Sequence, residues 1–364
     1  MDYNIFREAL NQMQAEVRSV NGSFENFINK ELTISQGIRS VASNSHNALR
    51  AFLRGLYEKD NTFPVVLSVV DSDFIGGSYG RETKIWPLDD IDIYVPLDGN
   101  SLVYINAYGT LPYTVKSDGN LINNPILLPR WCENNNVSSK KLIEEFSKVL
   151  SGHYGPATII KPKGEAVTIR MTHGETKTED GLGYDIVPCF SLKSNQLGNN
   201  EEFYLIPDGN NGWLRTNPKM DHETAEYLNS RNNKTFKKVV KLVKYWNKTM
   251  LNGKLNSYYI EYAIAGIYNS KNSENVFLMN ISYGLAWAFY ALSMAIVIGN
   301  QSSKLVGAPH IEPGYNSENE HIDLITKCKV VSQKANKAWE FEKNNDEKNA
   351  ISMWRQIFGD SFGE

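Results

Sequence analysis

The chain has 364 residues, of which 41% are hydrophobic and 22% charged, the proportions of an ordinary globular protein of about two domains. Its 38 basic and 41 acidic residues give a formal net charge of −3, which excludes a globally basic nucleic-acid coat. The three cysteines form no CxxC pair, which argues against a zinc module or a disulfide framework and favours a reducing cytoplasm.

Periodicity predicts the elements in chain order. Apolar residues at helical spacing predict helices over 3–20 and 35–59, and an apolar run over 63–70 reads as strand. DFIGGS leads into a turn, and DIDIYVPL alternates like a half-buried strand. A helix over 138–151 precedes strand patterns at 157–161, 166–171, 183–192 and 203–207, and strand signals fade after about residue 221.

This order predicts an α/β fold with a separate helical part. We divide it into N-terminal helices that pack on the core (1–60), an α/β core (61–220) and a helical domain (221–364). The uncharged stretch 276–303 is long enough to span a bilayer, but its serines, tyrosines and flanking asparagines favour a buried helix. The N-terminal segment has an early acid and no apolar leader pattern, so we expect a cytoplasmic protein without membrane contact.

Two carboxylates on one strand face are the first chemical signal. Asp90 and Asp92 are two residues apart in a strand pattern, so they share a face while Ile91 and Ile93 turn toward apolar packing. Ionised carboxylates side by side repel each other unless a cation lies between them, and hard oxygen ligands suit magnesium. Asp185, a lone charge in the apolar GYDIVP strand, is the candidate third carboxylate of a two-metal site.

A glycine pair precedes these carboxylates. In Gly76-Gly77-Ser78 the absence of side chains lets backbone N–H groups approach phosphate oxygens, and the Ser78 hydroxyl adds a donor. A Gly-Gly-Ser turn alone is common. Its spacing to an Asp-x-Asp strand and to a later lone Asp is a much narrower pattern.

A basic helix is predicted over residues 231–248. Phe236, Val239, Val240, Val243 and Trp246 form its apolar stripe, and lysines populate its other faces. We interpret these lysines as a solvated face, the usual fate of such a run.

The constellation resembles the polymerase-beta-like nucleotidyltransferase superfamily. GGSYGRETKIWPLDDIDIYV, GYDIVP, LIPDGNNGWLRTNP and KLVKYWNK…LNSYYIEYA are similar to motifs of bacterial relatives of cyclic GMP-AMP synthase and oligoadenylate synthase, the anti-phage cyclic oligonucleotide synthases. The resemblance covers roughly residues 75–262 and the closing WRQIFGDSFG. It implies a nucleotidyltransferase core with a mixed β-sheet and a C-terminal helical domain like that of oligoadenylate synthase.

The resemblance also implies site residues and cofactors. Asp90, Asp92 and Asp185 would be catalytic and would ligate two Mg²⁺ ions, with Mn²⁺ as a substitute. Nucleotide contacts would come from five residues: Gly77 and Ser78 of the turn, Lys244 and Ser257 at the triphosphate, and Tyr258 stacking on a base. From the residues alone, Tyr258 and Tyr259 are equally good core aromatics.

The implied substrates are nucleoside triphosphates, ATP or GTP first, joined into a cyclic di- or trinucleotide second messenger with release of pyrophosphate. Partners would be regulators or effectors of anti-phage signalling. The six scattered histidines match no zinc insertion, so a long nucleic-acid activator is not implied. Two alternatives stay open: a non-cyclising transferase acting on RNA ends, a protein or a small molecule, and a catalytically silent nucleotide-binding regulator.

Overall fold

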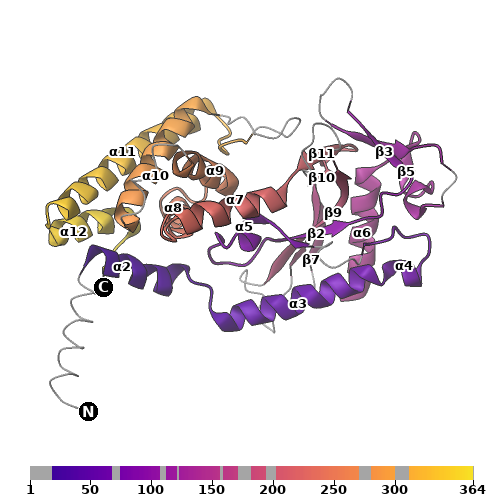
Figure 1. The fold of residues 1–364 in the computed structure, drawn as a ribbon, viewed down its shortest axis with the longest axis horizontal. Coiled ribbons are helices and arrows are strands. Elements are labelled where there is room, and N and C mark those ends of the chain that lie inside the picture. The colour runs from indigo at the N-terminus through magenta and orange to yellow at the C-terminus, as the bar shows by residue number, and fades with distance from the viewer. Residues whose placement is uncertain are drawn as a thin grey trace, which may run out of the picture.

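The computed structural model describes residues 19–67, 74–106, 112–120, 123–155, 159–170, 182–193, 202–269, 280–299 and 311–363. Figure 1 shows an α/β part beside a part built of helices, with α3 running along one side of the sheet. The predicted helix over 3–20 lies almost entirely outside the described residues.

The helices are α2 (Val20–Phe27), the π-helix η1 (Ile28–Leu32), α3 (Gln36–Arg54), α4 (Leu56–Lys59), α5 (Gly77–Gly80), the 3₁₀ helix η3 (Pro125–Leu127), α6 (Ser139–Tyr154), α7 (Pro218–Arg231), α8 (Phe236–Met250), α9 (Ser257–Tyr268), α10 (Ile281–Ile298), α11 (Glu318–Lys343) and α12 (Glu347–Phe358). The strands are β1 (Phe74–Ile75), β2 (Ile91–Pro96), β3 (Leu102–Ile105), β4 (Thr114–Ser117), β5 (Cys132–Glu133), β6 (Asn136–Val137), β7 (Ile159–Lys163), β8 (Ala166–Arg170), β9 (Gly183–Lys193), β10 (Glu202–Pro207) and β11 (Trp213–Thr216).

The central sheet is mixed, as predicted. Its seven strands follow the order β1-β2-β9-β10-β11, and β8 pairs with both β7 and β9. β2 and β9 run parallel, whereas the other pairs are antiparallel. Alternation along β2 buries Ile91 and Ile93 completely. The fold class expected from the sequence, a mixed α/β core with a helical domain, is therefore confirmed.

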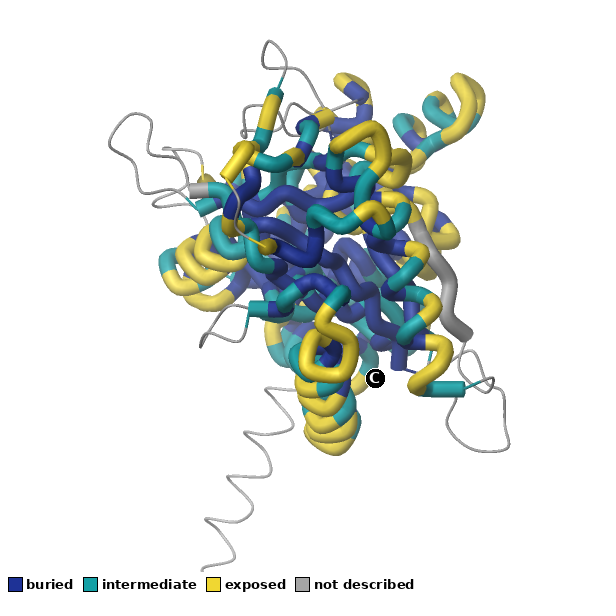
Figure 2. The backbone as a smooth tube through the Cα atoms, turned by 90° about the vertical axis from the view of Figure 1, so that its right-hand side faces the viewer, coloured by how far each residue is buried: buried dark blue, intermediate teal, exposed yellow. Residues whose placement is uncertain are grey.

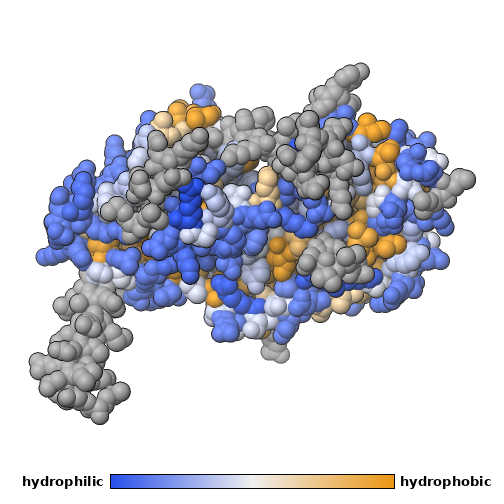
Figure 3. Space-filling model, viewed as in Figure 1, coloured by the Kyte–Doolittle hydropathy of each residue, from blue (hydrophilic) through white to orange (hydrophobic). Residues whose placement is uncertain are grey.

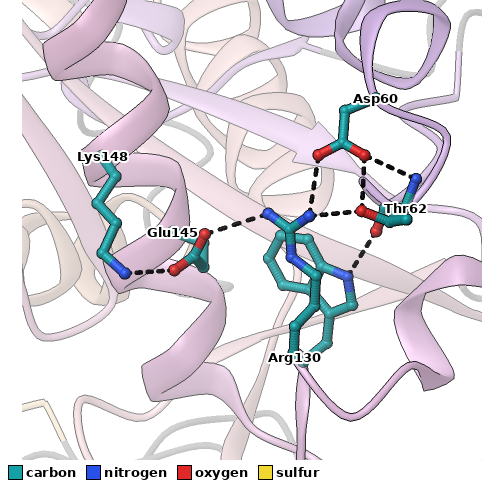
Figure 4. Close-up of polar contacts among 6 residues, drawn as sticks. Asp60, Thr62, Arg130, Glu145 and Lys148 are labelled. Carbon is teal, nitrogen blue, oxygen red and sulfur yellow. Dashed lines mark hydrogen bonds and ion pairs between the residues drawn. The ribbon is translucent and has the colours of Figure 1, made fainter.

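A smaller sheet of order β3-β4-β6-β5 lies at the far end of the α/β part. Arg130 connects this region to neighbouring segments (Figure 4). Its guanidinium forms ion pairs with Asp60, which follows α4, at 2.9 Å and with Glu145 of α6 at 3.1 Å. The Trp131 indole donates to the Thr62 carbonyl oxygen at 2.8 Å. These contacts join three segments that are distant in the sequence.

The helical part has its own hydrophobic core, built mainly from α8 to α12. α10 is long and apolar enough to cross a membrane, but 67% of it is buried inside the protein, as the sequence predicted. Its exposed residues include Trp287, Tyr290 and Met294 on one face. Figure 2 shows the buried backbone running through the centre of the molecule, and Figure 3 shows a mostly hydrophilic face with separate hydrophobic patches.

The N-terminal helices divide between the two cores. α3 contributes Ala42, Leu49 and Leu53 to the core of the α/β part, as expected. α2 instead places Phe24 and Phe27 in the core of the helical part, so the expectation that residues 1–60 pack on the α/β core is wrong for this helix. The residue boundaries of the three proposed domains stay a prediction.

α8 begins later than predicted. Asn233 and Lys234 have φ angles of 50° and 59°, a left-handed conformation that ends one helix before the next begins at Phe236. The predicted apolar stripe is buried throughout. The lysines do not form one solvated face, because Lys237 and Lys244 are buried.

Candidate active site

The sheet brings two of the predicted carboxylates side by side. Asp92 and Asp185 are Cα partners on the neighbouring parallel strands β2 and β9, and Asp90 immediately precedes β2. Asp185 is buried, and its Oδ1 accepts a hydrogen bond of 2.6 Å from the Thr168 hydroxyl on β8. Two segments distant in the sequence therefore place acidic groups at one end of β2, and a third supplies the Thr168 hydroxyl.

This crowding changes the acidity of Asp92. Burial, together with the negative charges of Asp185 and Asp90, raises the pKa of Asp92 to about 7. A carboxyl in such surroundings is stabilised in its ionised form by a nearby cation, and carboxylate oxygens are the ligands that magnesium prefers. The donor set therefore has the chemistry that a magnesium site needs.

A lysine already lies on this cluster. The Lys84 ammonium contacts Asp89 at 2.7 Å and also pairs with Asp90. Within the described ranges, no group of three or more His, Cys, Asp or Glu side chains is arranged to hold a metal ion. Asp90 would have to leave Lys84 to join Asp92 and Asp185 in one coordination shell, so metal ligation by the three aspartates stays a prediction.

The glycine turn faces Asp92 directly. Gly77 has a φ of 59°, and a Cβ on it would lie 1.6 Å from Asp92 Oδ2, a separation that no side chain permits. The Gly76 N–H donates to the Asp92 carbonyl oxygen at 2.9 Å, which fixes the turn to β2. The glycine pair thus permits the close approach of turn and carboxylate, whereas the approach of a phosphate to this turn, which the sequence suggested, stays a prediction.

A cleft of about 600 Å³ opens in front of these groups. Its walls come from both parts of the chain, so a ligand here would contact the sheet and the helices together. The lining residues are Gly77, Ser78, Arg81, Asp90, Asp92, Tyr94, Glu165, Ile206, Leu214, Arg215, Thr216, Pro218, Asp221, Asn256, Ser257, Tyr258, Glu261, Ile311 and Glu312.

Two predicted nucleotide contacts, Ser257 and Tyr258, begin α9 at the edge of the cleft. Asn256 caps this helix by accepting the Tyr258 N–H at 2.8 Å. The Tyr258 hydroxyl donates to Asp221 at 3.0 Å, and the Arg81 guanidinium lies 5.3 Å from its ring centre. One face of the ring is therefore near a cation, and the residue is still 37% exposed.

Lys244 lies deeper than a phosphate contact requires. It is buried on α8, its ammonium is 2.5 Å from Glu261 on α9, and it is absent from the cleft lining. Glu261 also accepts two hydrogen bonds from Arg81, at 2.8 and 3.1 Å. Burial opposes ionisation of Glu261, but Arg81 and Lys244 outweigh it and lower its pKa to about 2.

The sequence interpretation did not single out Glu261. Its signal was a lone acid in the apolar run SYYIEYAIAGIY, the same reasoning that selected Asp185. Arg81, in the motif GGSYGR, was given no role either. The structure shows that Arg81 links the glycine turn of the α/β part to Glu261 in the helical part.

Comparisons with known proteins place this geometry in context. No protein-family model matches the chain. It is 26% identical to a probable cyclic nucleotide synthase of Bacillus cereus strain VD146, over 95% of this chain and 98% of that protein. It is 28% identical to a cyclic AMP-AMP-AMP synthase of Acinetobacter sp. strain ATCC 27244, over 44% of this chain and 46% of that protein.

Solved structures agree in fold. CdnC of E. coli MS115-1, determined with ATP, matches with a TM-score of 0.60 and 16% identity over 95% of this chain and 99% of that one. The same protein in a complex with HORMA-deltaN matches with a TM-score of 0.60 and 16% identity over 94% and 98%. Over nearly its whole length the chain is thus similar in sequence to a probable cyclic nucleotide synthase, and it shares the fold of CdnC.

Proposed function

We propose that this protein is a magnesium-dependent nucleotidyltransferase that joins nucleoside triphosphates into a cyclic di- or trinucleotide and releases pyrophosphate. One observation carries the proposal: Asp92, whose strand partner is Asp185, faces a glycine turn at a cleft shared by both parts of the chain. The similarity to a probable cyclic nucleotide synthase, which extends over 95% of the chain, supports cyclic products.

The triphosphate would lie along the glycine turn. Backbone N–H groups of the turn and the Ser78 hydroxyl would donate to phosphate oxygens, and Ser257 would add a donor from the other wall. The base would stack on the exposed Tyr258 ring. Mg²⁺ held by Asp90, Asp92 and Asp185, with Mn²⁺ as a substitute, would neutralise the phosphates and lower the pKa of the attacking hydroxyl.

The acceptor ribose hydroxyl would attack the α-phosphorus. The new P–O bond forms as the bond to the bridging oxygen of the β-phosphate breaks, and pyrophosphate takes that electron pair. Asp185, which Thr168 orients, would accept the hydroxyl proton or position the hydroxyl. A second transfer within the linear product would close the ring.

The test is incubation of purified protein with labelled ATP, GTP, CTP and UTP and Mg²⁺. We expect a small product that resists phosphatase and disappears in the Asp90→Ala/Asp92→Ala variant. Asp98→Ala, just beyond the other end of β2, is the matched control and should keep the activity. Extended RNA or a modified protein would identify a non-cyclising transferase, and nucleotide binding without any turnover would identify a silent regulator.

We further propose that the product acts in anti-phage signalling in the cytoplasm, through regulators or effectors that recognise it. The resemblance supports the signalling role, and burial of most of α10 supports the location. Phage plaque counts on the native host should rise when the two aspartates are replaced. Recovery of the protein in the membrane pellet would contradict the cytoplasmic location.

A further inference from the structure

A second cavity, of about 310 Å³, lies on the other side of the glycine turn from the cleft. The four-residue helix α5 separates the two. Gly77 and Ser78 line the cleft, whereas Tyr79 and Gly80 line the second cavity. No function assigned above uses this cavity.

Positive charge gathers in the second cavity from three segments. Arg39 comes from α3, Lys241 from α8, and Lys84 from the segment after α5, and Glu82 is the single acid in the lining. Glu82 is already paired with Lys237 at 2.9 Å, and Lys84 with Asp89 and Asp90. Of the cations that line the cavity, Arg39 and Lys241 therefore remain to be explained.

Glu82 attracts both Arg39 and Lys241, but its ion pair is with Lys237. Arg39 donates its Nε–H to the Ile34 carbonyl oxygen at 3.1 Å, a neutral acceptor. Neither residue has an ion pair with any other residue that the structure describes. Both are half-buried, so solvent compensates their charges only in part.

The surroundings oppose the charge on Lys241. Burial and the neighbouring Arg39 lower the pKa of Lys241 to about 8. Two like charges in a partly dry cavity destabilise a fold unless an anion lies between them, just as paired carboxylates call for a cation. Ile34, Ile75 and the Tyr79 ring supply apolar surface beside them.

We infer that this second cavity binds a small phosphate-bearing anion, with the phosphate contacting Arg39 and Lys241 and an apolar group against Tyr79. The two unpaired positive charges match the double negative charge of a phosphate monoester. A guanidinium and an ammonium are the side chains that most often bind phosphate. The site is separate from the carboxylate cleft and does not depend on the proposed reaction.

The experiment is isothermal titration calorimetry of the full chain with inorganic phosphate and with phenyl phosphate, in EDTA so that no divalent metal is present. We expect saturable binding of one anion per chain, tighter for phenyl phosphate. Arg39→Gln/Lys241→Gln should weaken binding at least about tenfold. Lys248→Gln, an exposed lysine on the same helix, and Ser78→Ala, which alters the other cavity, should leave it unchanged.

Equal binding by the wild type and the double variant would overturn the inference. Loss of binding in Ser78→Ala would also overturn it, since the anion would then occupy the cleft. So would the absence of saturable binding. If the double variant does not fold, Lys241→Gln alone decides. Phosphate should raise the unfolding temperature of the wild type and not that of this variant, and an equal rise in both proteins would refute the site.

Discussion

At the scale of single residues, the spacing of Gly77, Asp90 and Asp92 predicted a candidate site, and the structure brings Gly77 against Asp92. Period-2 alternation fixes which side chains share a strand face, so the burial of Ile91 and Ile93 followed from the sequence. The pairing of Asp92 with Asp185 did not, because register between parallel strands is set by packing across the whole sheet. A lone charge in an apolar strand made Asp185 the candidate third carboxylate, but that pattern did not place it opposite Asp92.

Gly77→Ala should reduce nucleotidyl transfer about a hundredfold, because the new methyl group would push the Asp92 carboxylate from its place. Gly119→Ala is the matched control: Gly119 also has a positive φ, 90°, but its Cβ would meet nothing within 4 Å. Turnover by the two variants should therefore differ, although both carry a similar backbone cost. Equal activity would mean that the turn does not position Asp92.

Lys241→Met should stabilise the protein at pH 7 by about 1–3 kcal/mol in phosphate-free buffer. The pKa of Lys241 falls from 10.5 to about 8 on folding, so the folded chain binds this proton less tightly. The cost of charging it is complete below pH 8 and disappears as the pH rises toward 10.5. Urea unfolding at pH 7 and pH 10 should show the advantage of the variant shrinking with pH. An advantage that is independent of pH would contradict the assignment.

At the scale of elements, periodicity predicted the apolar stripe of α8 correctly and the fates of its lysines wrongly. Apolar spacing indicates which face of a helix packs against the core. It does not indicate whether an acidic residue of another element lies against the polar face. Lys237 meets Glu82 and Glu226, and Lys244 meets Glu261, all from other elements. Such pairs depend on tertiary contacts that a single helix does not encode.

Glu261→Gln should destabilise the protein by about 3–5 kcal/mol, because it leaves Arg81 and Lys244 buried with one fewer negative charge. The pKa of Glu261 is lowered on folding, so its contribution is complete above pH 4.5 and is lost as the pH falls toward 2. Denaturant unfolding of the variant should therefore converge with the wild type only in strong acid.

Asp323→Asn provides the control for this loss. Asp323 pairs with Lys327 one turn along α11, and both side chains are more than 40% exposed. Removing such a surface pair should cost less than about 1 kcal/mol. If both substitutions had equally small effects, the buried contact between the glycine turn and the helical part would not be the strong link that its geometry indicates.

At the scale of the whole molecule, the division into an α/β part and a helical part followed from where strand patterns end. The core that the N-terminal helix α2 joins did not follow from the sequence. Sequence proximity assigned α2 to the α/β part with α3, but its apolar face completes the core of the helical part. Which of two cores a short amphipathic helix joins depends on shape complementarity, and periodicity carries no information about that.

Phe24 is the centre of this long-range contact. Its ring centre lies 5.1 Å from that of Trp354, 6.1 Å from Phe358 and 4.8 Å from Phe362, so one side chain joins α2 to the end of the chain. Phe24→Ala should cost about 3–5 kcal/mol, because the tightly packed surroundings are unable to collapse into the space left behind. Val330→Ala on α11, at a residue that is 46% exposed, should change the stability by no more than about 0.5 kcal/mol.

The region of the protein that loses stability in Phe24→Ala shows which of the two cores α2 stabilises. If α2 belongs to the helical part, hydrogen exchange in Phe24→Ala should rise in α2 and α12, which contact each other, and stay unchanged in β2 and β9 of the central sheet. A uniform rise would mean that the protein unfolds as a single cooperative unit. A rise confined to α3 and the sheet would mean that α2 stabilises the α/β part after all, against the packing of Phe24 on Trp354.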